Sequence, residues 1–155
     1  MTDRQPQQRV EQATFGAGCF WGAEAAFRAL PGVVDSRVGF ARSAQGEADM
    51  IEVVQVDFDP GLTSYSQLVG HFWGLHDPTS VDRQGTDIGV KYRSALFVSN
   101  PAQAELAQAA KQYLEASGKV SKPVATVILP LGDFQLADQD QQRYLEKHGL
   151  GSCSL

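Results

Sequence analysis

Hydrophobic and polar residues alternate in several short stretches of the chain, a pattern typical of β-strands with one buried face. On the predicted strand 52–58, the residues that share one face are Glu52, Val54, Val56 and Phe58. Similar alternation or short apolar runs predict strands at residues 10–16, 33–40, 93–99 and 124–129.

Apolar residues at intervals of three or four predict helices between these strands. The first helix carries an apolar stripe from Phe20 to Leu30 and ends at Pro31-Gly32, because proline and glycine interrupt a helix. Further helices are predicted at residues 65–75, 100–115 and 138–147. The polar stretch 79–91 shows no periodicity and is predicted to be a binding loop.

The predicted elements follow the order strand, helix, strand, strand, helix, strand, with a further helix and strand added. This order predicts an α+β fold, a two-layer sandwich with a ferredoxin-like core in which helices pack on a mixed sheet. At 155 residues the chain is expected to form a single domain. Residues 1–9 are expected to be a flexible N-terminus and residues 148–155 a mobile tail.

Composition restricts the classes of function. The net charge is −5 and lysine and arginine are scattered, whereas a nucleic-acid-binding surface needs a basic patch. No signal peptide is visible, and no apolar run reaches the roughly 18 residues of a membrane span. Cys19 and Cys153 form no zinc pattern with the three histidines. We therefore expect a soluble, cytoplasmic protein without metal, membrane or nucleic acid, whose partner is a small molecule or another protein.

One of the two cysteines lies where a predicted strand meets a predicted helix. Cys19 belongs to the run Gly18-Cys19-Phe20-Trp21-Gly22, which begins the first helix. Backbone N–H groups and the helix dipole stabilise an anion at a helix N-terminus, so a cysteine there is a candidate nucleophile. Phe20 and Trp21 are candidates for the wall of an apolar pocket. The alternative is a small buried thiol that packs in the corner.

Three further side chains are candidates for polar chemistry. The alternation directs the Glu52 carboxyl toward the core, where desolvation raises the pKa of a carboxyl group and makes it a general acid. The alternative places Glu52 in water at a frayed strand end. Asp87 and Tyr92 lie on either side of Gly89 in the long loop. The Tyr92 hydroxyl can donate a hydrogen bond to a substrate oxygen. The alternative is that Tyr92 only packs at the start of the next strand. His76 is interpreted as a helix C-terminal cap.

The chain resembles the methionine sulfoxide reductase A family from about residue 13 to residue 153. The segment 18–22 is similar to the nucleophile motif of that family. The segments His76-Asp77-Pro78-Thr79, Asp82 to Gly89 and Tyr92-Arg93-Ser94 resemble its long central signature. Gly151-Ser152-Cys153 resembles its C-terminal resolving cysteine, with serine where tyrosine is frequent.

This resemblance implies a role for each candidate residue. Cys19 is the nucleophile and Glu52 the acid, and Phe20 and Trp21 form the pocket for the substrate methyl group. Asp87 and Tyr92 complete the polar side of the site. Cys153 is the resolving cysteine, which forms a disulfide with Cys19.

The implied activity is the thiol-dependent reduction of methionine S-sulfoxide, free or in proteins, to methionine. The reaction passes through a sulfenic acid on Cys19, and a thioredoxin-like reductant opens the Cys19–Cys153 disulfide. It needs no metal and no organic cofactor. The whole chain is expected to be one catalytic domain that acts as a monomer.

The chain departs from this family between Gly39 and Glu52. Its loop is shorter, begins with Phe40 and contains no tyrosine, so one of the two hydroxyls expected to hold the sulfoxide oxygen is missing. One alternative is therefore a weakly active or non-catalytic relative that binds methionine sulfoxide. A second alternative is a cysteine hydrolase or acyl transferase, which requires a histidine base beside Cys19.

Overall fold

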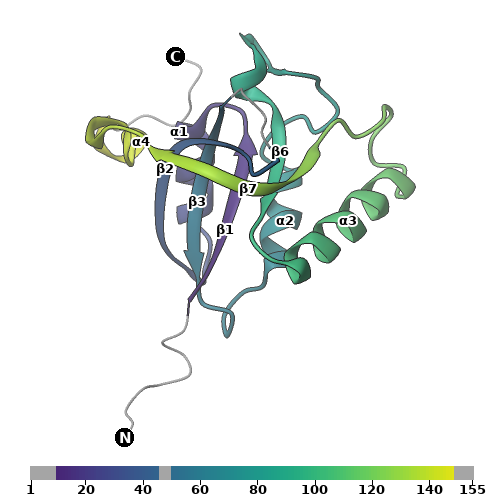
Figure 1. The fold of residues 1–155 in the computed structure, drawn as a ribbon, viewed down its shortest axis with the longest axis horizontal. Helices are drawn as coiled ribbons and strands as arrows, with labels where there is room; N and C mark the ends of the chain where they lie inside the picture. Colours follow the sequence, from purple (N-terminus) through teal and green to yellow (C-terminus); the bar gives the residue numbers. More distant parts are fainter. Residues whose placement is uncertain (1–9, 46–49, 149–155) are drawn as a thin grey trace, which may run out of the picture.

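Five strands of the computed structural model form a closed barrel in the order β1-β3-β2-β7-β6 (Figure 1). The structure describes residues 10–45 and 50–148. The barrel strands are β1 (Glu11–Ala17), β2 (Val33–Ser43), β3 (Ile51–Phe58), β6 (Ser94–Val98) and β7 (Val127–Leu136). Neighbouring strands are antiparallel except for β6 and β7, which are parallel. The short strands β4 (Arg83–Gln84) and β5 (Asp87–Ile88) form a separate hairpin.

The α+β class with a mixed sheet is confirmed, but the predicted two-layer sandwich is wrong. Strand β7 pairs with β2 on one side and with β6 on the other, and it thereby joins the two edges that a sandwich leaves open. The predicted strand 124–129 captured only the beginning of β7. Strand β2 also continues past residue 40, and its Gly39 lies opposite Leu136 of β7. A Cβ atom at Gly39 would overlap the carbonyl oxygen of Gln135, so glycine permits this close approach.

Strands β3 and β6 are buried on both faces, and the core accordingly forms two clusters. On one face, Val54, Val56 and Phe58 pack under the helices, as their alternation predicts. The intervening Ile51 and Val53 belong to a second cluster, whose buried members all come from barrel strands and fill the barrel. Strand β3 therefore presents hydrophobic residues to both sides.

In the described residues, four α-helices pack around the barrel. They are α1 (Phe20–Arg28), α2 (Tyr65–Trp73), α3 (Pro101–Ala116) and α4 (Tyr144–His148). The side chains of Ser64 and Asn100 cap α2 and α3 by accepting hydrogen bonds from backbone N–H groups. Figure 1 shows α2 and α3 together on one side of the barrel and α4 on the other. No helix among the described residues has the length and apolarity that a membrane crossing requires.

The predicted last helix, residues 138–147, is wrong as a single element. The segment forms a 3₁₀ turn at Gln139–Gln141 and then α4, separated by Arg143 at a φ of 52°. Gln142 is already extended, and the positive φ of Arg143 lies outside right-handed helical geometry, so one helix cannot run through the segment. The predicted tail begins at residue 148, but His148 is the last residue of α4. The rest of that tail, residues 149–155, and the predicted flexible N-terminus, residues 1–9, lie outside the described residues.

Candidate active site

Cys19 lies at the corner between β1 and α1, where it is the residue that precedes the first turn of the helix. Gly18 has a φ of 84°, which makes the sharp change of direction possible. A Cβ atom at Gly18 would lie 2.8 Å from Cγ of Gln84, so the corner packs tightly against β4. The predicted position of Cys19 at a helix N-terminus is confirmed.

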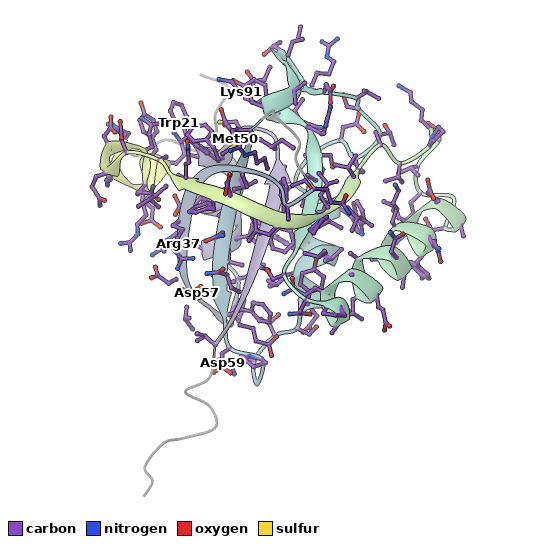
Figure 2. All side chains as sticks on the ribbon, in the orientation of Figure 1. Trp21, Arg37, Met50, Asp57, Asp59 and Lys91 are labelled. Atoms are coloured by element: carbon purple, nitrogen blue, oxygen red, sulfur yellow. The ribbon has the colours of Figure 1, made fainter. Side chains whose placement is uncertain are left out.

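A pocket of about 680 Å³ opens beside this corner. The predicted site residues that line it are Cys19, Phe20, Trp21, Glu52, Asp87 and Tyr92. They come from α1, β3 and the loop before β6, so the fold brings together residues that are distant in the sequence. Figure 2 shows Trp21 at one end of the barrel, while Asp57 and Asp59 lie toward the other. Cys153 lies outside the described residues, and its role stays a prediction.

Glu52 is buried in the pocket wall, with 7% of its surface exposed. The alternative in which it lies in water at a strand end is therefore wrong. Its Oε1 accepts a hydrogen bond of 3.2 Å from the backbone N–H of Phe20, which fixes the carboxyl at the start of α1. Burial raises the pKa of Glu52, although the Phe20 N–H and the Lys91 ammonium act in the opposite direction. This environment suits a carboxyl that must carry a proton.

The loop that carries Asp87 and Tyr92 is held by its own polar contacts. Arg93 donates two hydrogen bonds to the Asp82 carboxylate, at 2.6 and 3.1 Å. The backbone N–H of Gly89 donates to the carbonyl oxygen of Asp82 at 2.9 Å. A 3₁₀ turn, η2 (Val90–Tyr92), then brings the Tyr92 side chain to the pocket. The predicted long loop thus contains a small, ordered scaffold.

Strand alternation and helical periodicity do not identify several of the residues that line the pocket. Phe40 lies directly opposite Glu52 in the pairing of β2 with β3, and its ring packs against Phe20 with centroids 5.5 Å apart. Lys91 lies next to Tyr92 in a stretch without periodicity. The remaining lining residues come from the segment after β7 or its end, namely Gln135, Leu136, Ala137, Asp138, Asp140 and Gln141. Register with β3 places Phe40 in the pocket wall, in the segment where the resemblance implies a missing tyrosine hydroxyl.

The Trp21 side chain connects the pocket to residues 141–144, which are called the C-terminal segment below. Its Nε1–H donates to Oε1 of Gln141 at 2.9 Å, and its ring stacks on Tyr144 with centroids 3.8 Å apart. One turn further along α1, the buried Glu24 carboxylate accepts hydrogen bonds from the Ser36 hydroxyl and the Arg143 backbone N–H. The start of α1 therefore holds the C-terminal segment against the pocket.

The geometry does not provide the base that a cysteine hydrolase needs. Within the described part of the chain, no histidine lines the pocket. His76 is partly buried and lies outside it: one ring nitrogen bonds to the Phe72 carbonyl oxygen and the other to the Ser94 hydroxyl. Burial lowers the pKa of His76 to about 4. The bond to Phe72 agrees with a helix C-terminal cap. No group of three or more histidine, cysteine, aspartate or glutamate side chains in residues 10–45 and 50–148 is arranged to hold a metal ion.

Comparison with known proteins identifies relatives over nearly the whole chain. The sequence profile of the family described as peptide methionine sulfoxide reductase matches residues 11–155. The peptide methionine sulfoxide reductase MsrA of Methanoculleus marisnigri is 46% identical, over 96% of this chain and 96% of its own length. The crystal structure of Mxr1 from Saccharomyces cerevisiae in reduced form superposes with a TM-score of 0.82 at 32% identity, covering 94% of this chain and 90% of that one. Mxr1 crystallised in complex with Trx2 superposes with a TM-score of 0.63 at 29% identity, covering 92% of this chain and 90% of that one.

Proposed function

The chain belongs to the peptide methionine sulfoxide reductase family, and on that premise we propose that it reduces methionine S-sulfoxide, free or in proteins, to methionine. One observation carries the proposal for this chain. The buried Glu52 carboxyl is hydrogen-bonded to the backbone N–H of the residue that follows Cys19, inside a single pocket. This contact supports the proposed roles of Cys19 as the nucleophile and Glu52 as the proton donor.

The proposed reaction transfers oxygen from the substrate to Cys19. The Cys19 thiolate attacks the sulfoxide sulfur while Glu52 protonates the sulfoxide oxygen, which is a poor leaving group until it is protonated. The attack forms a bond between the Cys19 sulfur and the substrate sulfur. The protonated oxygen then passes to the Cys19 sulfur while this S–S bond and the S–O bond of the substrate both break, so methionine departs with its sulfur reduced by two electrons. The oxygen and its proton remain on Cys19 as a sulfenic acid.

The other walls of the pocket suit the two sides of a sulfoxide. The rings of Phe20 and Trp21 supply apolar surface for the methyl group on sulfur. Tyr92 and Asp87 supply polar groups on the side of the oxygen and the amino-acid backbone. The predicted loss of one tyrosine hydroxyl corresponds to Phe40, which contributes only carbon atoms to the wall beside Glu52.

Regeneration is proposed to use the second cysteine of the chain. Cys153 condenses with the Cys19 sulfenic acid, water leaves, and a thioredoxin-like protein opens the resulting disulfide by thiol exchange. The complex of the relative Mxr1 with Trx2 supports a partner of this kind. A cycle that returns to two thiols favours a reducing compartment, and we propose the cytoplasm.

The test compares the two sulfoxide epimers. The reduced protein is incubated with methionine S-sulfoxide or R-sulfoxide and dithiothreitol, and methionine is quantified by chromatography. We expect methionine from the S epimer alone, because one reductase acts on each epimer. Binding of the S epimer without methionine formation would instead identify a non-catalytic relative. Formation of methionine from neither epimer, with hydrolysis of a thioester, would identify a hydrolase.

A further inference from the structure

One positive charge lies beside the carboxyl group that we assign as the acid. Of the described residues that line the pocket, Lys91 alone carries a cationic side chain. Its Nζ lies 3.7 Å from Oε2 of Glu52 and 5.1 Å from the centre of the Tyr92 ring. The Lys91 side chain is 53% exposed, so the ammonium lies at the mouth of the pocket and remains accessible to a ligand. Figure 2 shows Lys91 at the same end of the barrel as Trp21.

The backbone that carries Lys91 is fixed on both sides. Val90 packs against the cluster inside the barrel, and Tyr92 lines the pocket. The N–H of Tyr92 donates to the carbonyl oxygen of Gly89, and the N–H of Arg93 donates to that of Val90. The anchored turn therefore fixes the backbone from which the Lys91 side chain extends to the carboxylate of Glu52.

The two oxygens of Glu52 are used differently. Oε1 accepts the hydrogen bond from the Phe20 N–H, whereas Oε2 is the atom that faces Lys91. A carboxyl group in this arrangement presents its proton on Oε2. An oxygen atom that receives that proton also comes within reach of the Lys91 ammonium, which has three N–H donors. Phe40 lies opposite Glu52 in the strand pair, and its side chain has no hydrogen-bond donor for the sulfoxide oxygen.

The inference rests on the function proposed above. We propose that Lys91 is a catalytic residue of this chain: its ammonium donates a hydrogen bond to the sulfoxide oxygen that Glu52 protonates. Lys91 keeps its own proton throughout, so the balance of the reaction is unchanged. Its contribution is to stabilise the negative charge on the oxygen as the thiolate adds to the sulfur, before proton transfer from Glu52 is complete. Tyr92 and the Glu52 carboxylate raise the pKa of Lys91, which keeps the ammonium charged.

Substitution of Lys91 by methionine tests this proposal, because methionine retains the length of the side chain and removes the donors. We expect kcat/KM for methionine S-sulfoxide to fall about 10- to 100-fold in K91M. K91R should recover part of the loss, since it restores a charged donor. K119M is the matched control: Lys119 is exposed after the end of α3, outside the pocket, and its loss should leave kcat/KM unchanged.

The pH profile separates donation to the substrate from an effect on Glu52 alone. Lys91 lowers the pKa of Glu52, so K91M should move the alkaline limb of the profile to higher pH. The other charged groups of the pocket, Asp87, Asp138 and Asp140, are unchanged in the variant. Our proposal predicts both this shift and a lower plateau below the limb. A shifted limb with an unchanged plateau would show that Lys91 only tunes Glu52 and would overturn the proposal.

Binding provides a readout that does not depend on turnover. In the C19S background, calorimetry measures the affinity for methionine S-sulfoxide, and K91M should weaken it several-fold while K119M should not. Unchanged affinity and unchanged kcat/KM in K91M would overturn the role of Lys91. If the unsubstituted protein forms no methionine, the proposed function fails, whereas a several-fold loss of affinity in K91M would still support contact between Lys91 and the sulfoxide.

Discussion

Two walls of the pocket differ in how they are built. The inner wall, formed by Cys19, Phe20, Phe40 and Glu52, belongs to the barrel and the start of α1, and Phe20 and Glu52 are almost completely buried. The outer wall, formed by residues 135–138, 140 and 141, is largely exposed. Cys19 and Glu52, the two groups assigned to bond making, thus lie on the wall that the barrel and the start of α1 form. The exposed outer wall is available to contact the polypeptide around the methionine sulfoxide, which differs from one substrate to another.

Beyond the end of β7, the outer wall is held by side-chain hydrogen bonds. The Gln142 amide accepts from the Val38 N–H and donates to the carbonyl oxygens of Val38 and Ala137. Glu24 fixes the next residue, Arg143, through its backbone N–H. We therefore expect substitutions in the inner wall to lower kcat and substitutions under the outer wall to affect stability and KM.

The largest effect is expected from C19S. A serine hydroxyl is not ionised near neutral pH, so the variant should form no detectable methionine in the assay with dithiothreitol. Circular dichroism should show an unchanged fold, because serine is close to cysteine in size. Residual activity near the level of the unsubstituted protein would exclude Cys19 as the nucleophile.

E52Q should lower the rate at neutral pH by about 100- to 10,000-fold, the usual contribution of a general acid. In the unsubstituted protein the acid acts while protonated, so the rate should fall as the pH rises through the raised pKa of Glu52. That alkaline limb should be absent from the profile of E52Q. An unchanged rate at pH 7 would remove Glu52 from the mechanism.

Y92F should lower kcat/KM less than E52Q lowers the rate. The expected loss is about 1–3 kcal/mol of transition-state stabilisation, or roughly 5- to 150-fold in kcat/KM, because the variant lacks one hydrogen-bond donor to a polar partner. Because Phe40 leaves Tyr92 as the one aromatic hydroxyl assigned to the sulfoxide oxygen, the loss should shrink in an F40Y background. Equal losses in the two backgrounds would mean that another group already replaces the missing hydroxyl.

E24Q should have the smallest effect on turnover and a clear effect on stability. Glu24 is 1% exposed and accepts from the Ser36 hydroxyl and the Arg143 N–H. Weakening these bonds should lower the free energy of unfolding in urea by about 1–3 kcal/mol and raise KM, with kcat nearly unchanged. E105Q, an exposed change on α3, serves as the control. A large loss of kcat in E24Q would contradict the division between the two walls.

The inner wall was largely predictable from the sequence, because its signals are local. Alternation placed Glu52 on the core face, and the switch from strand to helix placed Cys19 at a helix start. Barrel closure was not predictable in this way. Strand β7 contains Pro130 and Gly132, which normally argue against a strand, and its pairing with β2 joins distant segments. Lys91 and the outer wall lie in stretches without periodicity, so only the folded chain brings them to the pocket.

The central claim is that Cys19 takes the oxygen from the substrate, and a single turnover of C153S tests it most directly. The reduced variant is mixed with excess methionine S-sulfoxide without reductant, methionine is counted, and the protein is treated with a sulfenic acid probe and digested for mass spectrometry. We predict about one methionine per protein and the label on Cys19, with no recycling by thioredoxin. Methionine formed without label on Cys19, or no methionine at all, would contradict the account.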